Sequence, residues 1–142
     1  MSINVTVEAT VNPTEDETKV QRALLNIFPN AKVEKYSKRD DVIMLRIQGL
    51  GLKFLSTFRN IIRQERIRGA ARRILMSKVE GDHIIIFLHK QAAFVGRISF
   101  CGPEGESPLG PISIKIGTPS PESVVDYLAA TGKDGFQRFR ET

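Results

Sequence analysis

Polar and apolar residues alternate without interruption from residue 3 to residue 11, at the start of the chain. A period of two residues is typical of a strand that buries one face, so this segment predicts a half-buried strand. Residues 20–28 instead repeat apolar side chains at helical spacing. Thr14, with Glu17 three residues later, predicts a capping box at the start of this helix, and Pro29 is expected to end it.

Five further segments have the patterns of strands: residues 31–36, 41–47, 83–88, 94–100 and 112–116. The first two flank a polar turn at residues 37–40, which predicts a hairpin. A loop rich in glycine and proline, residues 101–111, is the segment that we expect to be most mobile. Ser120 and Pro121 predict the start of a last helix that runs through Ala130.

The segment 52–78 carries apolar residues at helical spacing on two different sides. Phe58 and Ile62 share one side of a helical wheel, whereas Ala71 and Leu75 fall on nearly the opposite side. One straight helix cannot bury both stripes, so we expect two helices with a break between residues 65 and 69. Gly69 suits a break, because glycine costs about 1 kcal/mol inside a continuous helix.

The order of these elements predicts an α+β fold. It follows the split βαβ plan, in which helices cover one face of a mainly antiparallel sheet and form a second layer. We assign residues 1–132 to a single domain and expect residues 133–142 to form a loosely ordered tail. The other face of the sheet would expose apolar side chains, namely Val42, Met44, Ile85 and Phe87. Because such a patch usually meets a partner, we expect a homodimer.

The amino-acid composition indicates a globular protein that does not span a membrane. Apolar residues make up 41% of the chain and charged residues 26%, which is typical of globular proteins. No apolar run approaches the roughly 20 residues that cross a bilayer, and the start of the chain does not have the pattern of a secretory signal. We therefore expect a cytoplasmic protein without membrane contact. With Cys101 as its one cysteine and no catalytic motif, the sequence predicts neither an enzyme nor a cofactor or metal site.

Positive charge is concentrated in the segment 52–78. This segment holds eight basic residues and one acid, whereas the whole chain has a net charge of +5. Arginine forms paired hydrogen bonds with phosphate, so these side chains are candidates for contacts to a nucleic-acid backbone. The candidates are Arg59, Arg63, Arg66 and Arg72. The alternative is a solvated helix flank whose arginines pair with acids elsewhere in the chain.

The segment 90–97 partly resembles the basic and aromatic strand motif of RNA recognition domains. Lys90 matches that motif, but Ala92 and Arg97 stand where stacking aromatic rings belong. The pattern therefore favours core packing over base stacking. Lys90 and Arg97 are left as candidates for phosphate contacts.

Three motifs support a family resemblance: RQERIRGAAR at residues 63–72, HKQAAFVG at residues 89–96 and PLGPI at residues 108–112. Together they resemble an archaeal family of uncharacterised proteins that is assigned to RNA binding, and the resemblance covers almost the whole chain. It implies a fold similar to that of the large-subunit ribosomal protein called L-five, no cofactor, dimers and a predicted association with the exosome, an RNA-processing complex. It also adds weight to Lys90 and Gln91 as binding residues.

Two hypotheses follow from the sequence. The first is a non-catalytic RNA-binding protein that contacts phosphates through Arg59, Arg63, Arg66, Arg72, Lys90, Gln91 and Arg97. The second is a dimeric interaction protein with no affinity for nucleic acid, in which the arginines pair with acids. Exposed arginines on one surface would favour the first hypothesis, and buried ion pairs would favour the second.

Overall fold

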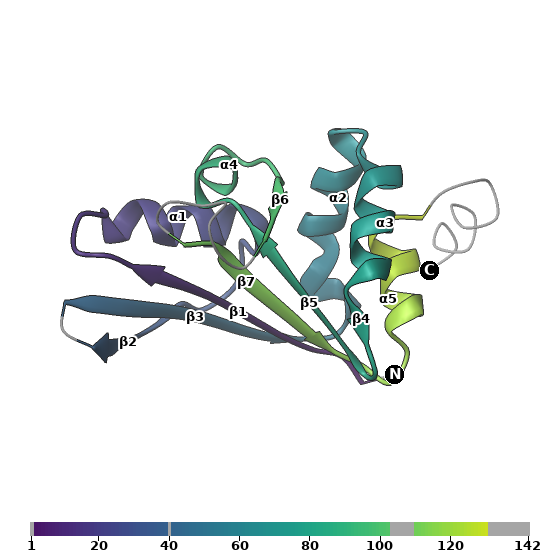
Figure 1. The fold of residues 1–142 in the computed structure, drawn as a ribbon, viewed down its shortest axis with the longest axis horizontal. Helices are drawn as coiled ribbons and strands as arrows, with labels where there is room; N and C mark the ends of the chain where they lie inside the picture. The colour runs from purple at the N-terminus through teal and green to yellow at the C-terminus, as the bar shows by residue number, and fades with distance from the viewer. Residues whose placement is uncertain (1, 40, 103–109, 131–142) are drawn as a thin grey trace.

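Seven strands form one sheet in the computed structural model, which describes residues 2–39, 41–102 and 110–130 (Figure 1). The strands are β1 (Asn4–Val11), β2 (Glu34–Arg39), β3 (Val42–Leu50), β4 (Val79–Glu80), β5 (His83–Leu88), β6 (Phe100–Cys101) and β7 (Ile112–Gly117). Their order is β2-β3-β1-β7-β5-β4, and β6 pairs with β5. Every pairing among these strands is antiparallel, which agrees with the predicted mainly antiparallel sheet.

Strand β1 organises the sheet because it pairs on both sides. Val7 lies opposite Ile47 of β3 and Ile114 of β7, and all three side chains are fully buried. The alternation predicted for residues 3–11 is thus confirmed. Strands β1 and β2 run in the same direction with β3 between them, so β1, the helix that follows it and β2 form a split βαβ unit.

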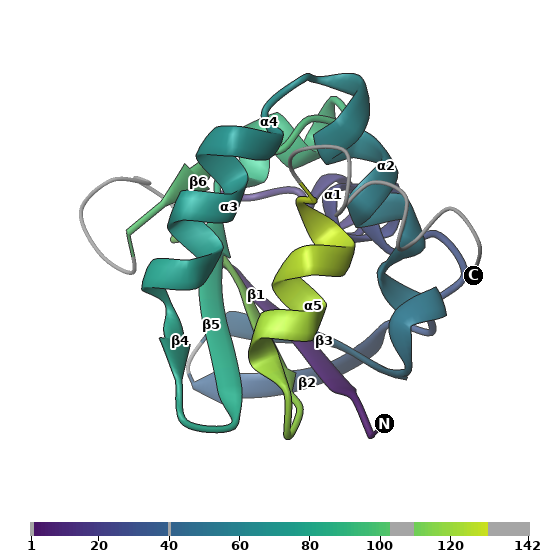
Figure 2. The same ribbon diagram turned by 90° about the vertical axis from the view of Figure 1, so that its right-hand side faces the viewer.

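The helices all cover the same face of the sheet (Figures 1 and 2). They are α1 (Glu17–Ile27), the 3₁₀ helix η1 (Leu52–Leu55), α2 (Ser56–Gln64), α3 (Arg68–Ser77), α4 (Lys90–Phe94) and α5 (Pro121–Leu128). Helices α1 and α4 lie over one end of the sheet, and α2, α3 and α5 lie over the other. Each long helix buries an apolar stripe against the strands, which confirms the predicted two-layer α+β architecture.

The break in the basic segment lies within the predicted interval, but a glycine does not make it. Arg66 has a positive φ of 58°. Its N–H donates to the carbonyl of Arg63 at 3.1 Å, and the N–H of Ile67 donates to that of Ile62 at 3.2 Å. These two hydrogen bonds define a Schellman motif, in which glycine usually occupies the left-handed position. Gly69, which suggested the break, lies instead in the first turn of α3.

Hydrogen bonds correct the predicted start of α1 and the predicted extent of strand β2. The predicted capping box at Thr14 is absent, because the side chain of Asp16 accepts from the N–H of Thr18 at 2.9 Å and caps α1. The predicted hairpin is confirmed, but its first strand lies three residues further along the chain than expected and its second strand is longer. Residues 37–39, predicted as a turn, continue β2 and pair with β3.

The predicted strand at residues 94–100 is wrong over most of its length. Phe94 ends α4, and Phe100 and Cys101 alone pair with β5 as β6. The cause is a contact with α1, since the Asn26 side chain donates to the carbonyls of Ala93 and Phe94, both at 2.9 Å. Such a contact satisfies the open carbonyls at the end of a helix, and no local pattern reveals it.

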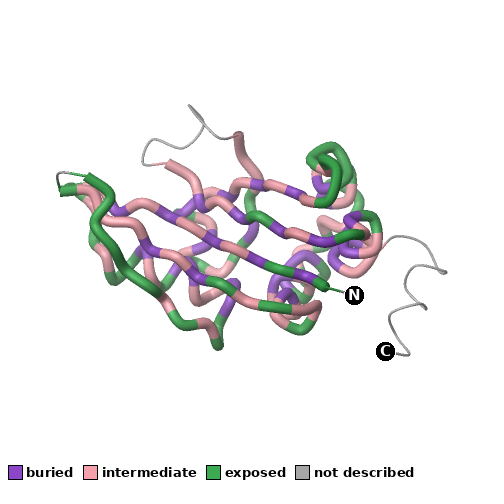
Figure 3. Tube along the Cα trace, turned by 90° about the horizontal axis from the view of Figure 1, so that it is seen from below, coloured by how far each residue is buried: buried purple, intermediate pink, exposed green. Residues whose placement is uncertain are grey.

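The sheet face opposite the helices is open (Figure 3). Met44, Ile85 and Phe87 point to this face and are half-buried, since their neighbours in each strand are buried on the helical side. The predicted apolar character of this face therefore holds. The predicted tail and most of the predicted mobile loop lie outside the described residues.

Candidate nucleic-acid interface

Three arginines gather where α2 meets α3. Arg63 occupies the last turn of α2, Arg66 lies in the connection, and Arg68 is the first residue of α3. Arg63 and Arg66 are exposed, and Arg68 is half-buried. The first turn of α3 holds no acid, and no side chain caps its N-terminus. A helix N-terminus of this kind attracts anions through its backbone N–H groups and dipole.

A hydrogen bond brings the backbone beside a fourth arginine to the α2–α3 connection. The Glu65 carboxylate accepts from the N–H of Ile98 at 3.0 Å, which joins the α2–α3 connection to a segment 33 positions away. Arg97 is exposed and is the neighbour of Ile98, just as Arg66 is the neighbour of Glu65. We call the surface formed by Arg63, Arg66, Arg68 and Arg97 the arginine tip.

Two other predicted arginines face α5 instead. The Arg59 guanidinium carbon lies 4.9 Å from the centroid of the Tyr127 ring. Arg72 forms an ion pair of 2.7 Å with Asp126. Both arginines are half-buried, so they help to hold α5 against α2 and α3. The predicted cluster is therefore divided, with Arg63 and Arg66 at the tip and Arg59 and Arg72 in contact with α5.

Lys90 is buried in an ion pair. Its Nζ donates to both carboxylate oxygens of Glu15, at 2.9 and 3.2 Å, and to the Thr10 carbonyl at 2.6 Å. The side chains of Lys90 and Glu15 are each 7% exposed. Burial lowers the pKa of Lys90, although its hydrogen bond with Glu15 opposes the change. The structure does not support the expected phosphate contact of Lys90, because these acceptors enclose its ammonium group.

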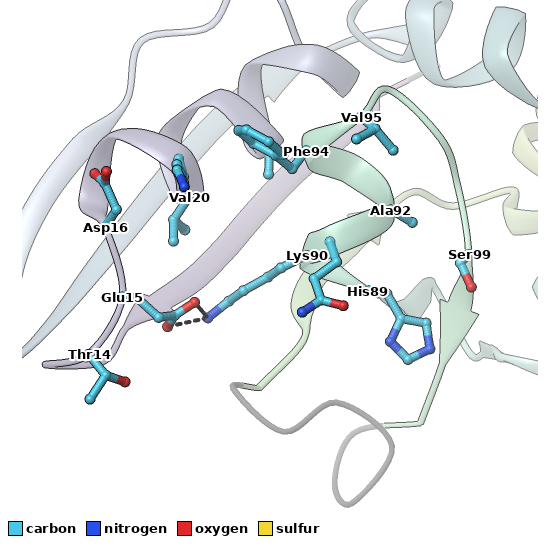
Figure 4. A pocket seen from close by; sticks show the side chains of 13 residues that line it. Thr14, Glu15, Asp16, Val20, His89, Lys90, Ala92, Phe94, Val95 and Ser99 are labelled. Carbon is cyan, nitrogen blue, oxygen red and sulfur yellow. Dashed lines mark hydrogen bonds and ion pairs between the residues drawn. The ribbon is translucent and has the colours of Figure 1, made fainter.

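A groove of about 800 Å³ lies between α1 and α4 (Figure 4). We call it the α1–α4 groove. Gln91, the neighbour of Lys90, is exposed and lines it, so the two predicted residues have different environments. Figure 4 shows the Lys90 side chain extending from α4 to Glu15, at the segment that leads into α1.

The open face of the sheet carries a separate charged cluster. The Arg46 Nε donates to the Glu8 carboxylate at 2.7 Å, and the Tyr36 hydroxyl donates to the same carboxylate at 3.2 Å. The Arg46 guanidinium also covers the Tyr36 ring, 4.8 Å from its centroid. The hydrogen bond with Glu8 raises the pKa of Arg46. Because Arg46 is engaged with Glu8 and Tyr36, this face is less suited to phosphate than the arginine tip.

Sequence reasoning missed two residues that shape the arginine tip. Arg68 was counted in the basic segment but was not singled out, because a helical wheel does not show where a helix begins. Glu65 was noted as the lone acid of that segment, yet its hydrogen bond with the Ile98 backbone has no sequence signal. The partial resemblance to an RNA recognition strand was misleading, since residues 90–94 form a helix.

The fold and this site define an α+β protein that has an open antiparallel sheet on one side and a group of exposed and half-buried arginines on its helical side. A family model described as RNA binding matches residues 4–118. A UPF0201 protein of Metallosphaera sedula is 42% identical over 127 residues, which cover 88% of this chain and 86% of that protein. A UPF0201 protein of Aeropyrum pernix is 40% identical over 140 residues, 96% and 93% of the two chains.

A solved structure has the same fold. The crystal structure of a UPF0201 protein from Methanococcus jannaschii superimposes with a TM-score of 0.80 and 30% identity, and the match covers 93% of this chain and 96% of that one. The chain therefore belongs to the UPF0201 family, whose model carries the description RNA binding. These archaeal relatives confirm the resemblance to an archaeal family that is assigned to RNA binding. Within the part of the chain that the structure describes, no helix has the length and apolarity needed to cross a membrane.

Proposed function

We propose that the protein is a non-catalytic RNA-binding protein that holds backbone phosphates at the arginine tip. The observation that carries this proposal is the conformation of Arg66. A left-handed conformation costs a residue other than glycine about 1–2 kcal/mol, and glycine would form the same Schellman motif without that cost. Strain of this kind is found at functional sites. Glycine would satisfy the fold at this position, whereas the guanidinium group of arginine can also bind an anionic ligand.

The surroundings of Arg66 support the same conclusion. Arg63 and Arg97 are exposed beside it. Glu65, the one acid in the segment 52–78, is half-buried and accepts a backbone hydrogen bond. A cluster of cations binds a polyanion by releasing its counterions. Arg59 and Arg72 have a lesser role in this proposal, because both interact with α5.

A binding assay on a tip variant tests the proposal. Arg63, Arg66 and Arg97 are each replaced by alanine, and the affinity for a fluorescently labelled single-stranded RNA is measured by anisotropy. Each lost phosphate contact reduces affinity about fivefold at about 0.1 M salt, so the triple variant should bind about 100-fold more weakly. The matched control replaces three exposed cations near the β2–β3 hairpin, Lys32, Lys38 and Arg39.

The control should lose much less affinity than the tip variant. Equal losses in the two variants would mean that binding follows net charge and not the arginine tip. No binding by the unmodified protein, to single-stranded or structured RNA, would contradict the proposal and favour the second hypothesis, a dimeric interaction protein without affinity for nucleic acid.

We also propose that the protein forms a homodimer through the open face of the sheet. Half-buried apolar side chains, Met44, Ile85 and Phe87, lie on this face, away from the helices. Sedimentation at micromolar concentration should give the mass of a dimer, and a Phe87→Arg variant should be monomeric. A monomeric unmodified protein would contradict this. Membership of an RNA-processing complex and a cytoplasmic location stay predictions from the sequence.

A further inference from the structure

The α1–α4 groove has mainly apolar walls and a few polar groups. Val20 and Ala23 of α1 face it from one side, and Ala92 and Phe94 of α4 from the other. Val95, at the rim, is 65% exposed, which is unusual for an apolar side chain of this size. A volume of about 800 Å³ lies in the range of small-molecule sites in proteins.

The groove is not an anion site. Its charged lining residues balance, with Lys19 and Lys90 against Glu15 and Asp16. The buried pair of Lys90 and Glu15 satisfies its own charges, so neither group is available to a ligand. A neutral ligand that combines apolar faces with hydrogen-bonding edges fits this lining better than an ion does.

The groove adjoins the arginine tip through residues 95–99. Val95 and Ser99 line the groove, and Arg97 lies between them in the sequence. The backbone N–H of Arg97 donates to the carbonyl of Ala92, another lining residue, at 2.9 Å. The N–H of His89 donates to the carbonyl of Ser99, also at 2.9 Å, and holds the other end of this segment. The segment that carries Arg97 therefore borders the groove.

Both ends of α4 are fixed, so the groove exists before a ligand arrives. Lys90 fixes the start of α4 to Glu15 and Thr10, and Asn26 fixes its end through two hydrogen bonds. A preformed site binds more tightly than one that must first be ordered.

We propose that the α1–α4 groove receives one unstacked base of a single-stranded RNA whose phosphates lie on the arginine tip. This inference rests on the proposed function and deepens it by naming the kind of RNA. A nucleobase has the required chemistry, since it is neutral, has two apolar faces and carries donors and acceptors on its edges. Gln91, His89 and Ser99 stand at the groove to meet those edges. A duplex, whose bases are stacked and paired, offers only the phosphates.

The test compares a labelled single-stranded RNA with a strand of the same length whose central nucleotides are abasic. Both strands carry the same phosphates. The unmodified protein should bind the intact strand about tenfold more tightly, the scale of one base contact. Ala92→Phe, which fills the groove, should remove this preference while the dependence of binding on salt stays the same. Val95→Ser, at an exposed position, should reduce the preference and does not threaten the fold.

The outcomes separate the two proposals. Equal affinity of the unmodified protein for both strands, with a normal salt dependence, would overturn the base-binding groove and leave the arginine tip intact. A preference that survives in both the Ala92→Phe and Val95→Ser variants would also overturn it. Failure to bind either strand would contradict the proposed function and the groove together.

Discussion

Removal of the Lys90 ammonium group should destabilise the fold strongly. In a Lys90→Met variant the side chain keeps much of its volume and loses its charge. Glu15 then stays buried as a carboxylate, and the Thr10 carbonyl loses a donor 2.6 Å away. The N–H and side chain of Asn12 still donate to Glu15, at 3.0 and 2.9 Å, so the carboxylate is not left without partners.

The magnitude follows from the burial of the pair. Breaking a buried ion pair by removing one partner costs about 3–5 kcal/mol. We expect about 3 kcal/mol here, because the hydrogen bonds from Asn12 remain. At about 2–4 °C per kcal/mol for a chain of this size, the midpoint of thermal unfolding should fall by about 6–12 °C. Urea unfolding at neutral pH, followed by circular dichroism, measures the free energy directly.

A second variant tests the cause of this loss. Glu15→Gln combined with Lys90→Met removes the unpaired charge and keeps an acceptor for Asn12. The double variant should therefore be more stable than Lys90→Met alone. A Lys90→Met protein within about 1 kcal/mol of the original, or a double variant that is no more stable than the single one, would refute this reasoning.

Three further predictions follow from particular residues. Because burial lowers the pKa of Lys90 in the folded state, the unfolded chain holds that proton more tightly, and the neutral amine that forms at high pH can still donate hydrogen bonds to Glu15 and Thr10, which methionine cannot. The contribution of Lys90 to stability should therefore rise with pH in the interval just below about 10.4, and the difference in unfolding free energy between the original protein and Lys90→Met should grow there. A Gly49→Ala methyl group would overlap the Phe54 ring, which stacks on Phe28 with centroids 5.1 Å apart, so urea unfolding should report a loss of about 1–3 kcal/mol. Arg66→Gly should raise the unfolding free energy by about 1 kcal/mol and weaken RNA binding, whereas a variant that loses stability would contradict the strain assigned to Arg66.

Much of the fold is visible in local patterns. The alternation in β1 and the apolar stripe of α1 are each long enough to specify one buried face, and the structure buries those faces. The two opposed stripes around Phe58 and Leu75 require two helices, and the structure has two. These predictions succeed because burial against a single sheet dictates the period of apolar residues in each element.

The errors arise where a contact between distant segments decides the structure. The strand pattern at residues 94–100 forms a strand only at Phe100, because Phe94 belongs to the end of α4, which Asn26 and Glu15 hold against α1 and its leading segment. The sequence did not predict that Arg66 would form the break, because glycine usually occupies the left-handed position of a Schellman motif. Local propensity is a weak guide where tertiary hydrogen bonds compete with it.

The candidate site was harder to predict than the fold. Charge density alone indicated Arg59, Arg63, Arg66 and Arg72, and their separation into two groups depends on where α5 packs. The position of Arg97 beside the α2–α3 connection depends on one hydrogen bond between Glu65 and Ile98. Lys90 was a candidate for phosphate contacts, but its side chain points inward to Glu15. Sequence spacing carries no information on such orientations.

The dependence of RNA affinity on salt tests the central claim most directly. For four phosphate contacts at the arginine tip, the logarithm of the association constant for single-stranded RNA should fall with the logarithm of salt concentration at a slope of about −3. The variant that lacks Arg63, Arg66 and Arg97 should give a slope of about −1, and the variant that lacks Lys32, Lys38 and Arg39 should keep the original slope. Equal slopes for the original protein and the tip variant would contradict phosphate binding at the arginine tip.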